Sequence, residues 1–407
     1  MKCRHCSAQL EQSLIDLGFA PASNAYLSSE QLSKTEKYYP LRVVVCNTCW
    51  LVQTEDYAAA DELFDENYAY FSSTSKSWLL HAKQYCDKMT SLLNLNANSL
   101  VVELASNDGY LLKNFVESHI PCLGIEPTKS TAQAAEKLGI PVLQKFFGQA
   151  LGQTLANEGK LADLVLGNNV YAHVPDINDF TLGIKAILKP SGTVTLEFPH
   201  LANLMAHKQF DTIYHEHFSY LSLLAVQKIF EACGLRVYHV DELPTHGGSL
   251  RIYGCHHADS RATSDSVREV LAREVGMGLD RAGGYAELQD NALAIKLDVM
   301  DFLTKQKRLG KKVAAYGAAA KGNTLLNYCG IHADLVSYVC DAAASKQGHY
   351  MPGSHIPIVS PSRIAQDRPD FILILPWNLR SEVVEQLSFA RQWGARFVTA
   401  VPEIEIF

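Results

Sequence analysis

Residues 99–110 read SLVVELASNDGY, and they give the clearest indication of the fold. The apolar run at 99–104 predicts a buried strand. The small and polar residues that follow predict a tight turn, and a helix begins at about residue 111. A strand, a turn and a helix in this order form the ligand-binding edge of a doubly wound α/β sheet. The sequence therefore predicts a nucleotide-like ligand at this turn, with an ordinary βα turn as the alternative.

The composition of the turn favours S-adenosylmethionine over a dinucleotide. Ala105 and Asn107 stand where a glycine-rich turn would carry glycine, and a pyrophosphate needs the close approach that glycine permits. S-adenosylmethionine carries a sulfonium and a ribose diol instead of a phosphate, and Glu126 ends the next strand, where its carboxylate can accept from ribose hydroxyls. The residues predicted to bind this cofactor are Glu103, Ala105, Ser106, Asn107, Asp108, Gly109, Glu126, Asn168 and Asn169.

Alternating strand and helix patterns continue on both sides of this turn. Further strands are expected at 122–126, 163–167 and 193–198, with a hairpin of 235–243 and 249–256. A parallel α/β sheet that finishes with a hairpin is the outline of a class I methyltransferase. Residues 262–308 read as helical, and a second α/β pattern begins at 311, with strands at 335–340, 370–375 and 397–401.

Ten cysteines stand out in the composition, and four of them form two close pairs. Cys3 and Cys6 are spaced C-x2-C, as are Cys46 and Cys49. Each pair can hold one side of a tetrahedral ion, so the four predict a closed, structural zinc site. A rubredoxin-like iron site and four unrelated buried thiols remain as alternatives. The expected domains are a zinc-binding domain at 1–75, a methyltransferase domain at 76–260 and a helical plus α/β Rossmann-like domain at 261–407.

Length and charge exclude several other classes of protein. The 407 residues suffice for two or three domains, and 47% hydrophobic with 19% charged residues is globular composition. No apolar run is long enough for a membrane span, and the polar start is not a secretory signal. A net charge of −7 argues against nucleic acid as a partner. We expect a cytoplasmic protein that is a monomer or a small homo-oligomer.

Residues 211–220, DTIYHEHFSY, gather histidine, tyrosine and glutamate between a strand and a helix. The spacing differs from H-E-x-x-H, so the two histidines point to different faces of a helix and catalytic zinc is not predicted. A histidine with a near-neutral pKa can remove a proton from carbon beside a carbonyl, and a tyrosine or second histidine can hold the enolate oxygen. A polar loop that packs at a domain interface explains the same residues equally well.

Residues 316–323, YGAAAKGN, follow a strand and open a helix in the terminal α/β pattern. A helix N-terminus with small residues and a lysine suits an anion, so we expect this loop to hold a diphosphate. A Rossmann-like domain retained for packing is the alternative. The residues predicted to contact the substrate are Tyr316, Lys321, Asn323, Arg251 and His246.

Together these motifs resemble the sugar C-methyltransferases of deoxysugar biosynthesis over the whole chain. The matching stretches include ELASNDGYLL, NNVYAHVPD, YHEHFSYLS and YGAAAKGNTLLN. The resemblance implies S-adenosylmethionine and zinc as cofactors, and a nucleoside-diphosphate 4-keto-6-deoxy sugar that is methylated at C3 through an enolate. It also implies His217 as the base, assisted by Tyr214, Glu216 and His173, with Tyr68 or Tyr70 lining the site.

Rival functions lead to different expectations. A nicotinamide-dependent oxidoreductase acting on a sugar nucleotide would bind NAD(P)H, against which the imperfect glycine spacing of both loops counts. A zinc-ribbon scaffold would not need the YHEH cluster. An O- or N-methyltransferase would not need a base that forms an enolate.

Overall fold

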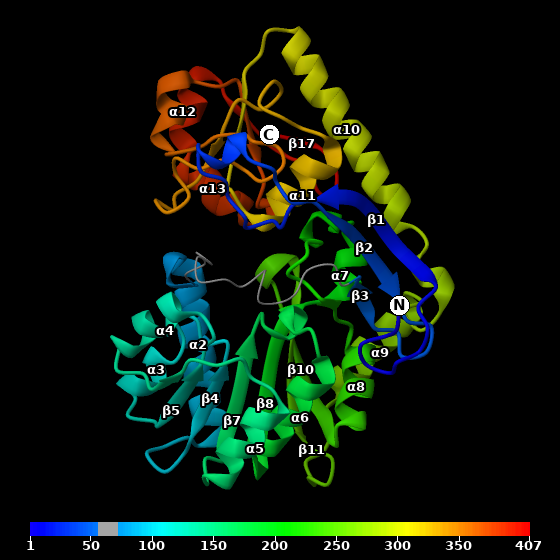
Figure 1. Cartoon of the computed structure of the whole chain (residues 1–407), viewed down its shortest axis with the longest axis vertical. Helices are drawn as coiled ribbons and strands as arrows, with labels where there is room; N and C mark the ends of the chain where they lie inside the picture. The colour runs from blue at the N-terminus through cyan, green and yellow to red at the C-terminus, as the bar shows by residue number, and fades with distance from the viewer. Residues whose placement is uncertain (56–71) are drawn as a thin grey trace.

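The computed structural model describes residues 1–55 and 72–407. Within this part of the chain the strands form sheets of four, seven and six strands. Figure 1 shows the seven-stranded sheet at one end of the molecule and the six-stranded sheet at the other, with the N-terminal strands along one side. The predicted α/β fold class, with two α/β units and a small cysteine-bearing unit, is confirmed. No helix of the described residues is long and apolar enough to cross a membrane.

The seven-stranded sheet contains the strand predicted at 99–104, which is β4 in the structure. Its order is β10-β11-β8-β7-β4-β5-β6, with β4 to β8 paired parallel and β10, β11 and β8 paired antiparallel. All four residues of β4 are buried, as expected for a central parallel strand, although one of them is Glu103. The strands are β4 (Val101–Leu104), β5 (Cys122–Ile125), β6 (Val142–Leu143), β7 (Ala162–Asn168), β8 (Leu188–Pro199), β10 (Leu235–Leu243) and β11 (Ser249–His256). The predicted hairpin at the edge of the methyltransferase sheet is therefore confirmed.

Helices cover both faces of this sheet, and the carboxyl ends of its parallel strands point toward the C-terminal part of the chain (Figure 1). Because parallel strands bring their carboxyl ends to one edge, the loops after β4, β5 and β7 can meet there. The helices are α2 (Lys76–Leu93), α3 (Lys113–Glu117), α4 (Lys129–Glu136), α5 (Gln149–Asn157), α6 (Ile177–Ile187), α7 (Leu201–Ala206) and α8 (Leu223–Ala232).

The N-terminal sheet is completed by a strand from much later in the chain. Its order is β1-β2-β3-β9, with β1 (Gln12–Ala20), β2 (Tyr39–Val45), β3 (Val52–Thr54) and β9 (Ser219–Tyr220). β9 lies directly after the YHEH motif and pairs with β3. The N-terminal unit is thus joined by backbone hydrogen bonds to the segment predicted to carry the base.

The terminal unit is a six-stranded, mostly parallel sheet reached through two long helices. Its strands are β12 (Val313–Tyr316), β13 (Val339–Cys340), β14 (Ile358–Val359), β15 (Phe371–Ile374), β16 (Arg396–Thr399) and β17 (Glu405–Ile406). Its helices are α11 (Ala320–Cys329), α12 (Ser362–Asp367) and α13 (Arg380–Gln386), preceded by α9 (Asp265–Gly276) and α10 (Leu288–Arg308). One buried cluster contains Ile15 of β1, Leu288 of α10 and Val313 of β12, so the first and last units share a core.

Candidate active site

One cavity of about 760 Å³ lies where the three parts of the chain meet. It is lined by Asn24 of the N-terminal unit, by the loops after β4, β5 and β7, by the YHEH segment, and by the loop that opens α11. The volume is in the range of small-molecule sites in proteins. A single cavity therefore joins the predicted cofactor loop to the predicted base and to the loop predicted to hold a diphosphate.

The loop after β4 has the backbone conformation that a close-approaching ligand needs. Ala105 and Asn107 both have positive φ, at 56° and 49°. The Glu126 carboxylate stabilises this turn, because its two oxygens accept from the backbone N–H groups of Asn107 and Thr128, both at 2.9 Å. Each carboxylate oxygen can accept more than one hydrogen bond, so Glu126 can still accept from a ribose. Ala105, Asn107 and Glu126 all line the cavity.

Four residues predicted to bind the cofactor lie behind the loop instead of among the described residues that line the cavity. Gly109 packs against the next helix, where a Cβ would lie 2.4 Å from Ile140 Cδ1. Asp108 accepts a hydrogen bond from the backbone of Ser73. Ser106 is fully buried, and Glu103 is buried in β4 with a pKa raised well above its ordinary value, chiefly by burial and then by nearby carboxylates. These residues shape the loop from behind.

Asn168 ends β7, the strand next to β4, and Asn169 follows it; both residues line the cavity. Both side-chain polar atoms of Asn168 and the Oδ1 of Asn169 are buried without a hydrogen-bond partner within the described structure. Asn169 also has positive φ, at 54°. These buried amides can donate to and accept from a bound molecule, and the amino-acid end and ribose of S-adenosylmethionine offer matching groups, so the residues fit this cofactor.

The cysteine quartet forms a compact metal site away from this cavity. The four sulfur atoms lie within 4.8 Å of one another, with Cys3 and Cys49 at 3.5 Å and Cys6 and Cys46 at 3.5 Å. Tetrahedral zinc with Zn–S bonds of about 2.3 Å separates its sulfur ligands by about 3.8 Å, so the residues fit the ion. Four protein ligands leave no open position for substrate, and the site is structural.

His217 lies between η4 (Phe210–Thr212) and β9 and lines the cavity. Its Nδ1 is 3.1 Å from the carbonyl oxygen of Thr212. A carbonyl can only accept, so Nδ1 carries the proton and Nε2 is the basic nitrogen of the neutral ring. Burial lowers the pKa of His217 well below 6.5, and the neighbouring His173 lowers it further. The ring is therefore neutral at neutral pH.

Two of the predicted partners of His217 contact its ring. The ring centroids of Tyr214 and His217 are 4.0 Å apart, those of His173 and His217 are 4.6 Å apart, and both partners line the cavity. Burial lowers the pKa of His173 to about 4, so this ring is neutral too. Glu216 is 1% exposed and reaches the cavity through Asn24, whose amide donates to its carboxylate at 3.1 Å. Burial raises the pKa of Glu216.

Lys321 and His246 are brought to the cavity, as predicted for substrate contacts. Lys321 Nζ donates to Asn378 Oδ1 at 2.7 Å and lies 4.5 Å from the centre of the Trp377 ring. Burial lowers the pKa of Lys321, and the negative charge of Asp211 acts in the opposite direction. His246 has positive φ, at 55°, and burial lowers its pKa to about 4.

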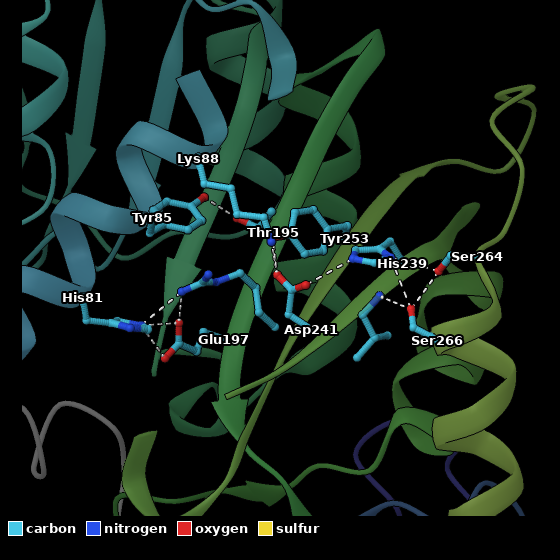
Figure 2. A network of polar contacts seen from close by, with 12 residues as sticks. His81, Tyr85, Lys88, Thr195, Glu197, His239, Asp241, Tyr253, Ser264 and Ser266 are labelled. Carbon is cyan, nitrogen blue, oxygen red and sulfur yellow. Dashed lines mark hydrogen bonds and ion pairs between the residues drawn. The ribbon is translucent and has the colours of Figure 1, made fainter. Parts of the chain in front are cut away.

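The other three predicted substrate residues lie elsewhere. The Tyr316 hydroxyl donates to Gln386 at 2.7 Å, and its ring packs in the core of the terminal sheet. Asn323 is 1% exposed in α11 and does not line the cavity. Arg251 Nη2 donates to Glu197 Oε2 of β8 at 2.5 Å. Arg251 also borders a separate recess of about 320 Å³, together with His81 and Lys88. Figure 2 shows the polar network around Glu197 and His81. None of these three predicted residues is among the described residues that line the cavity.

Several residues that line the cavity were not predicted from the sequence, and three of them carry polar or aromatic groups from separate parts of the chain. Asn24 comes from the N-terminal unit, Trp78 from the first turn of α2, and Lys346 from the loop after β13. No motif surrounds these residues in the sequence, although a lysine with a glycine close after it, at Lys346, weakly indicates anion binding. Tyr68 and Tyr70, one of which was predicted to line the site, lie outside the described residues.

Fold and site together define a class I, S-adenosylmethionine-dependent methyltransferase with a zinc-binding unit. Comparisons with known proteins narrow this class. Residues 3–64 match the family described as "Putative zinc binding domain", residues 78–240 match "Methyltransferase domain", and residues 244–402 match "C-methyltransferase C-terminal domain". C-methyltransferase NovU from Streptomyces niveus is 34% identical over 402 residues, which cover 99% of this chain and 96% of NovU. The chain belongs to the C-methyltransferase family, and its cofactors are S-adenosylmethionine and zinc.

Solved structures resemble about half of the chain. Magnesium protoporphyrin IX methyltransferase (ChlM) from Synechocystis PCC 6803, with bound SAH, is 14% identical with a TM-score of 0.35, covering 44% of this chain and 84% of that chain. A SAM-dependent methyltransferase from Anabaena variabilis ATCC 29413 is 13% identical with a TM-score of 0.39, covering 49% and 96%.

Proposed function

We propose that the protein methylates C3 of a nucleoside-diphosphate 4-keto-6-deoxy sugar through an enolate, with His217 as the base. One observation carries this proposal. A neutral imidazole, held through Nδ1 by the Thr212 carbonyl, shares one cavity with the loop at Ala105 and Asn107. A C-methyltransferase must first create a nucleophilic carbon, and a neutral imidazole beside the cofactor loop suits that step.

The chemistry of the step follows from the residues around His217. His217 Nε2 takes the C3 proton, which the adjacent C4 ketone acidifies, and the C–H electron pair moves into the enolate. Bound S-adenosylmethionine would supply an electrophilic methyl group on a cationic sulfonium, whose S–CH3 bond would break as the C3–CH3 bond forms, leaving S-adenosylhomocysteine. Tyr214 packs on the His217 ring and fixes its plane, while the neutral His173 contacts its edge. Glu216 and Asn24 border the same loop.

The substrate class is tested with a panel of 4-keto-6-deoxy sugars linked to dTDP, GDP or CDP. We expect S-adenosylhomocysteine and a methylated sugar nucleotide from one carrier. Binding of S-adenosylhomocysteine together with the matching nucleoside diphosphate, measured by calorimetry, should identify the same carrier. NAD(P)H binding without S-adenosylhomocysteine binding would instead favour an oxidoreductase.

The pH dependence of kcat/KM follows from the lowered pKa of His217. The basic form is populated above that pKa, so kcat/KM should be flat at neutral pH and should fall only on the acid side, below 6.5. A pH profile of kcat/KM for the sugar nucleotide measures this. A fall that begins above neutral pH as the pH is lowered would exclude His217 in this environment as the base.

Lys321 is the cation that we propose for the diphosphate. Replacing Lys321 by alanine should raise the KM for the sugar nucleotide by about tenfold, because a charge-assisted hydrogen bond to phosphate is lost. The KM for S-adenosylmethionine should stay unchanged. The control is Lys189→Ala, since Lys189 pairs with Asp163 outside the cavity lining. An unchanged KM for the sugar nucleotide in Lys321→Ala would overturn this assignment.

A further inference from the structure

Five residues behind and along the cavity wall form a ring, which four side-chain contacts and the peptide bond between Thr245 and His246 close. Glu197 Oε1 accepts from Thr245 Oγ1 at 3.0 Å, and His246 follows Thr245 in the chain. The His246 and Trp78 rings meet edge to face with centroids 5.2 Å apart, and Trp78 stacks on His81 at 4.9 Å. His81 Nε2 returns to the Glu197 carboxylate at 2.9 Å, as Figure 2 shows. The ring therefore begins and ends at one carboxylate.

Glu197, where the ring begins and ends, is a buried anion. Its side chain has no solvent exposure, and it also accepts from Arg251 Nη2 at 2.5 Å. Burial alone would raise its pKa, but the hydrogen bonds and charges of His81 and Arg251 keep the pKa below the ordinary value. An ionised carboxylate accepts strong hydrogen bonds, so both of its contacts with the ring are well suited to fix geometry.

The loop carrying His246 has a backbone that needs such an anchor. His246, Gly247 and Gly248 have successive positive φ values of 55°, 90° and 113°. A non-glycine residue in this region is strained, and the surrounding structure must hold it there. Thr245 is fixed on Glu197, and Gly247 is pressed against Trp377, where a Cβ would lie 2.3 Å from the indole.

Only two of the five ring residues border the reaction cavity. Trp78 and His246 line the reaction cavity, whereas Glu197, Thr245 and His81 are not among the described residues that line it. The backbone of Glu197 also accepts from Asn169 N–H at 2.7 Å, next to the cofactor side of the cavity. The carboxylate thus lies behind a wall made of one indole and one imidazole.

We propose that Glu197 is a positioning residue that, through Thr245 and His81, holds His246 and Trp78 as a rigid wall for the sugar substrate. This rests on the proposed function, because the wall orients the substrate that His217 deprotonates. Misplacing a wall that positions the reacting carbon lowers the rate even when the reacting groups are intact. The cofactor loop is anchored separately by Glu126, so cofactor binding should not depend on the ring.

Thr245→Val tests the proposal, because it removes the hydroxyl that reaches Glu197 and keeps the shape of the side chain. We expect kcat/KM for the best sugar nucleotide of the panel to fall by about tenfold, the loss expected for a hydrogen bond to a charged group. The dissociation constant of S-adenosylhomocysteine should not change. Thr195→Val is the matched control, because it removes a hydroxyl that bonds Tyr85 at 2.6 Å in the same network, and Thr195 is not one of the five residues of the ring.

A second readout does not need turnover. The fluorescence emission of Trp78 is obtained by subtracting the spectrum of the same protein carrying Trp78→Phe. We expect this emission to change in Thr245→Val and to stay the same in Thr195→Val. Unchanged kinetics and unchanged emission in Thr245→Val would overturn the proposal, as would equal losses in the two variants. If the wild-type protein methylates no keto-sugar nucleotide, the proposed function fails, and the emission still decides whether Thr245 positions the wall.

Discussion

Replacing His217 by asparagine should lower kcat by about 10²–10⁴-fold, the contribution expected of a general base. Asparagine has a similar size and can still donate to the Thr212 carbonyl, but it offers no basic nitrogen. The reaction is followed as S-adenosylhomocysteine release with the sugar nucleotide selected by the panel. S-adenosylhomocysteine binding, measured by calorimetry, should be retained, because the loop after β4 is untouched.

The matched control is His215→Asn, two positions away in the same motif. His215 also lies in the YHEH segment, but its Nε2 is 3.2 Å from the Pro40 carbonyl and it does not line the cavity. This variant should keep most of the activity. Comparable losses in both variants would mean that the motif acts through its packing, and substantial activity in His217→Asn would remove His217 as the base.

Loss of the zinc ion should lower both the stability of the protein and its methyltransferase activity. Zinc-binding units of this size depend on the metal for folding, so Cys46→Ser should lose the ion and unfold the N-terminal sheet. β3 of that sheet pairs with β9, and Thr54 Oγ1 donates to the backbone carbonyl of His217 at 2.5 Å. We therefore expect lost activity as well as a lower melting temperature.

Zinc content by elemental analysis, thermal unfolding and activity measure this prediction together. Cys233→Ser is the control, because Cys233 is a buried thiol outside the quartet whose sulfur lies 3.9 Å from the carbonyl of Asn178. It should keep one zinc per chain and near-normal activity. Full activity in a zinc-free Cys46→Ser protein would contradict the coupling of the N-terminal sheet to His217.

Local patterns in the sequence were enough for much of the fold. The apolar run of β4 and the turn after it predicted the cofactor edge, and the C-x2-C spacing predicted the sulfur cluster. Both features depend on residues close together in the chain or on one repeated spacing. The hairpin of β10 and β11 is likewise local, with a short loop between two β-rich runs.

Contacts between segments far apart in the chain could not be predicted from the sequence. Nothing local says that β9 completes the N-terminal sheet, or that Asn24 reaches the YHEH segment, because both depend on how separate units pack. Arg251 looked like a phosphate ligand beside a glycine pair, but a buried cation takes the nearest buried anion, which is Glu197. Tyr316 ends a strand whose neighbouring core buries its ring. A residue type indicates chemistry, and only the packing decides which way the side chain turns.

The proposed reaction is methylation at C3 after His217 removes the C3 proton. The most direct measurement uses a C3-deuterated 4-keto-6-deoxy sugar nucleotide and S-adenosylmethionine with a ¹³C-labelled methyl group, followed by NMR of the product. We expect a labelled methyl group bonded to C3 and loss of the deuterium from the sugar. A labelled methyl group on C5, the other carbon beside the ketone, or on an oxygen, with deuterium kept at C3, would contradict it.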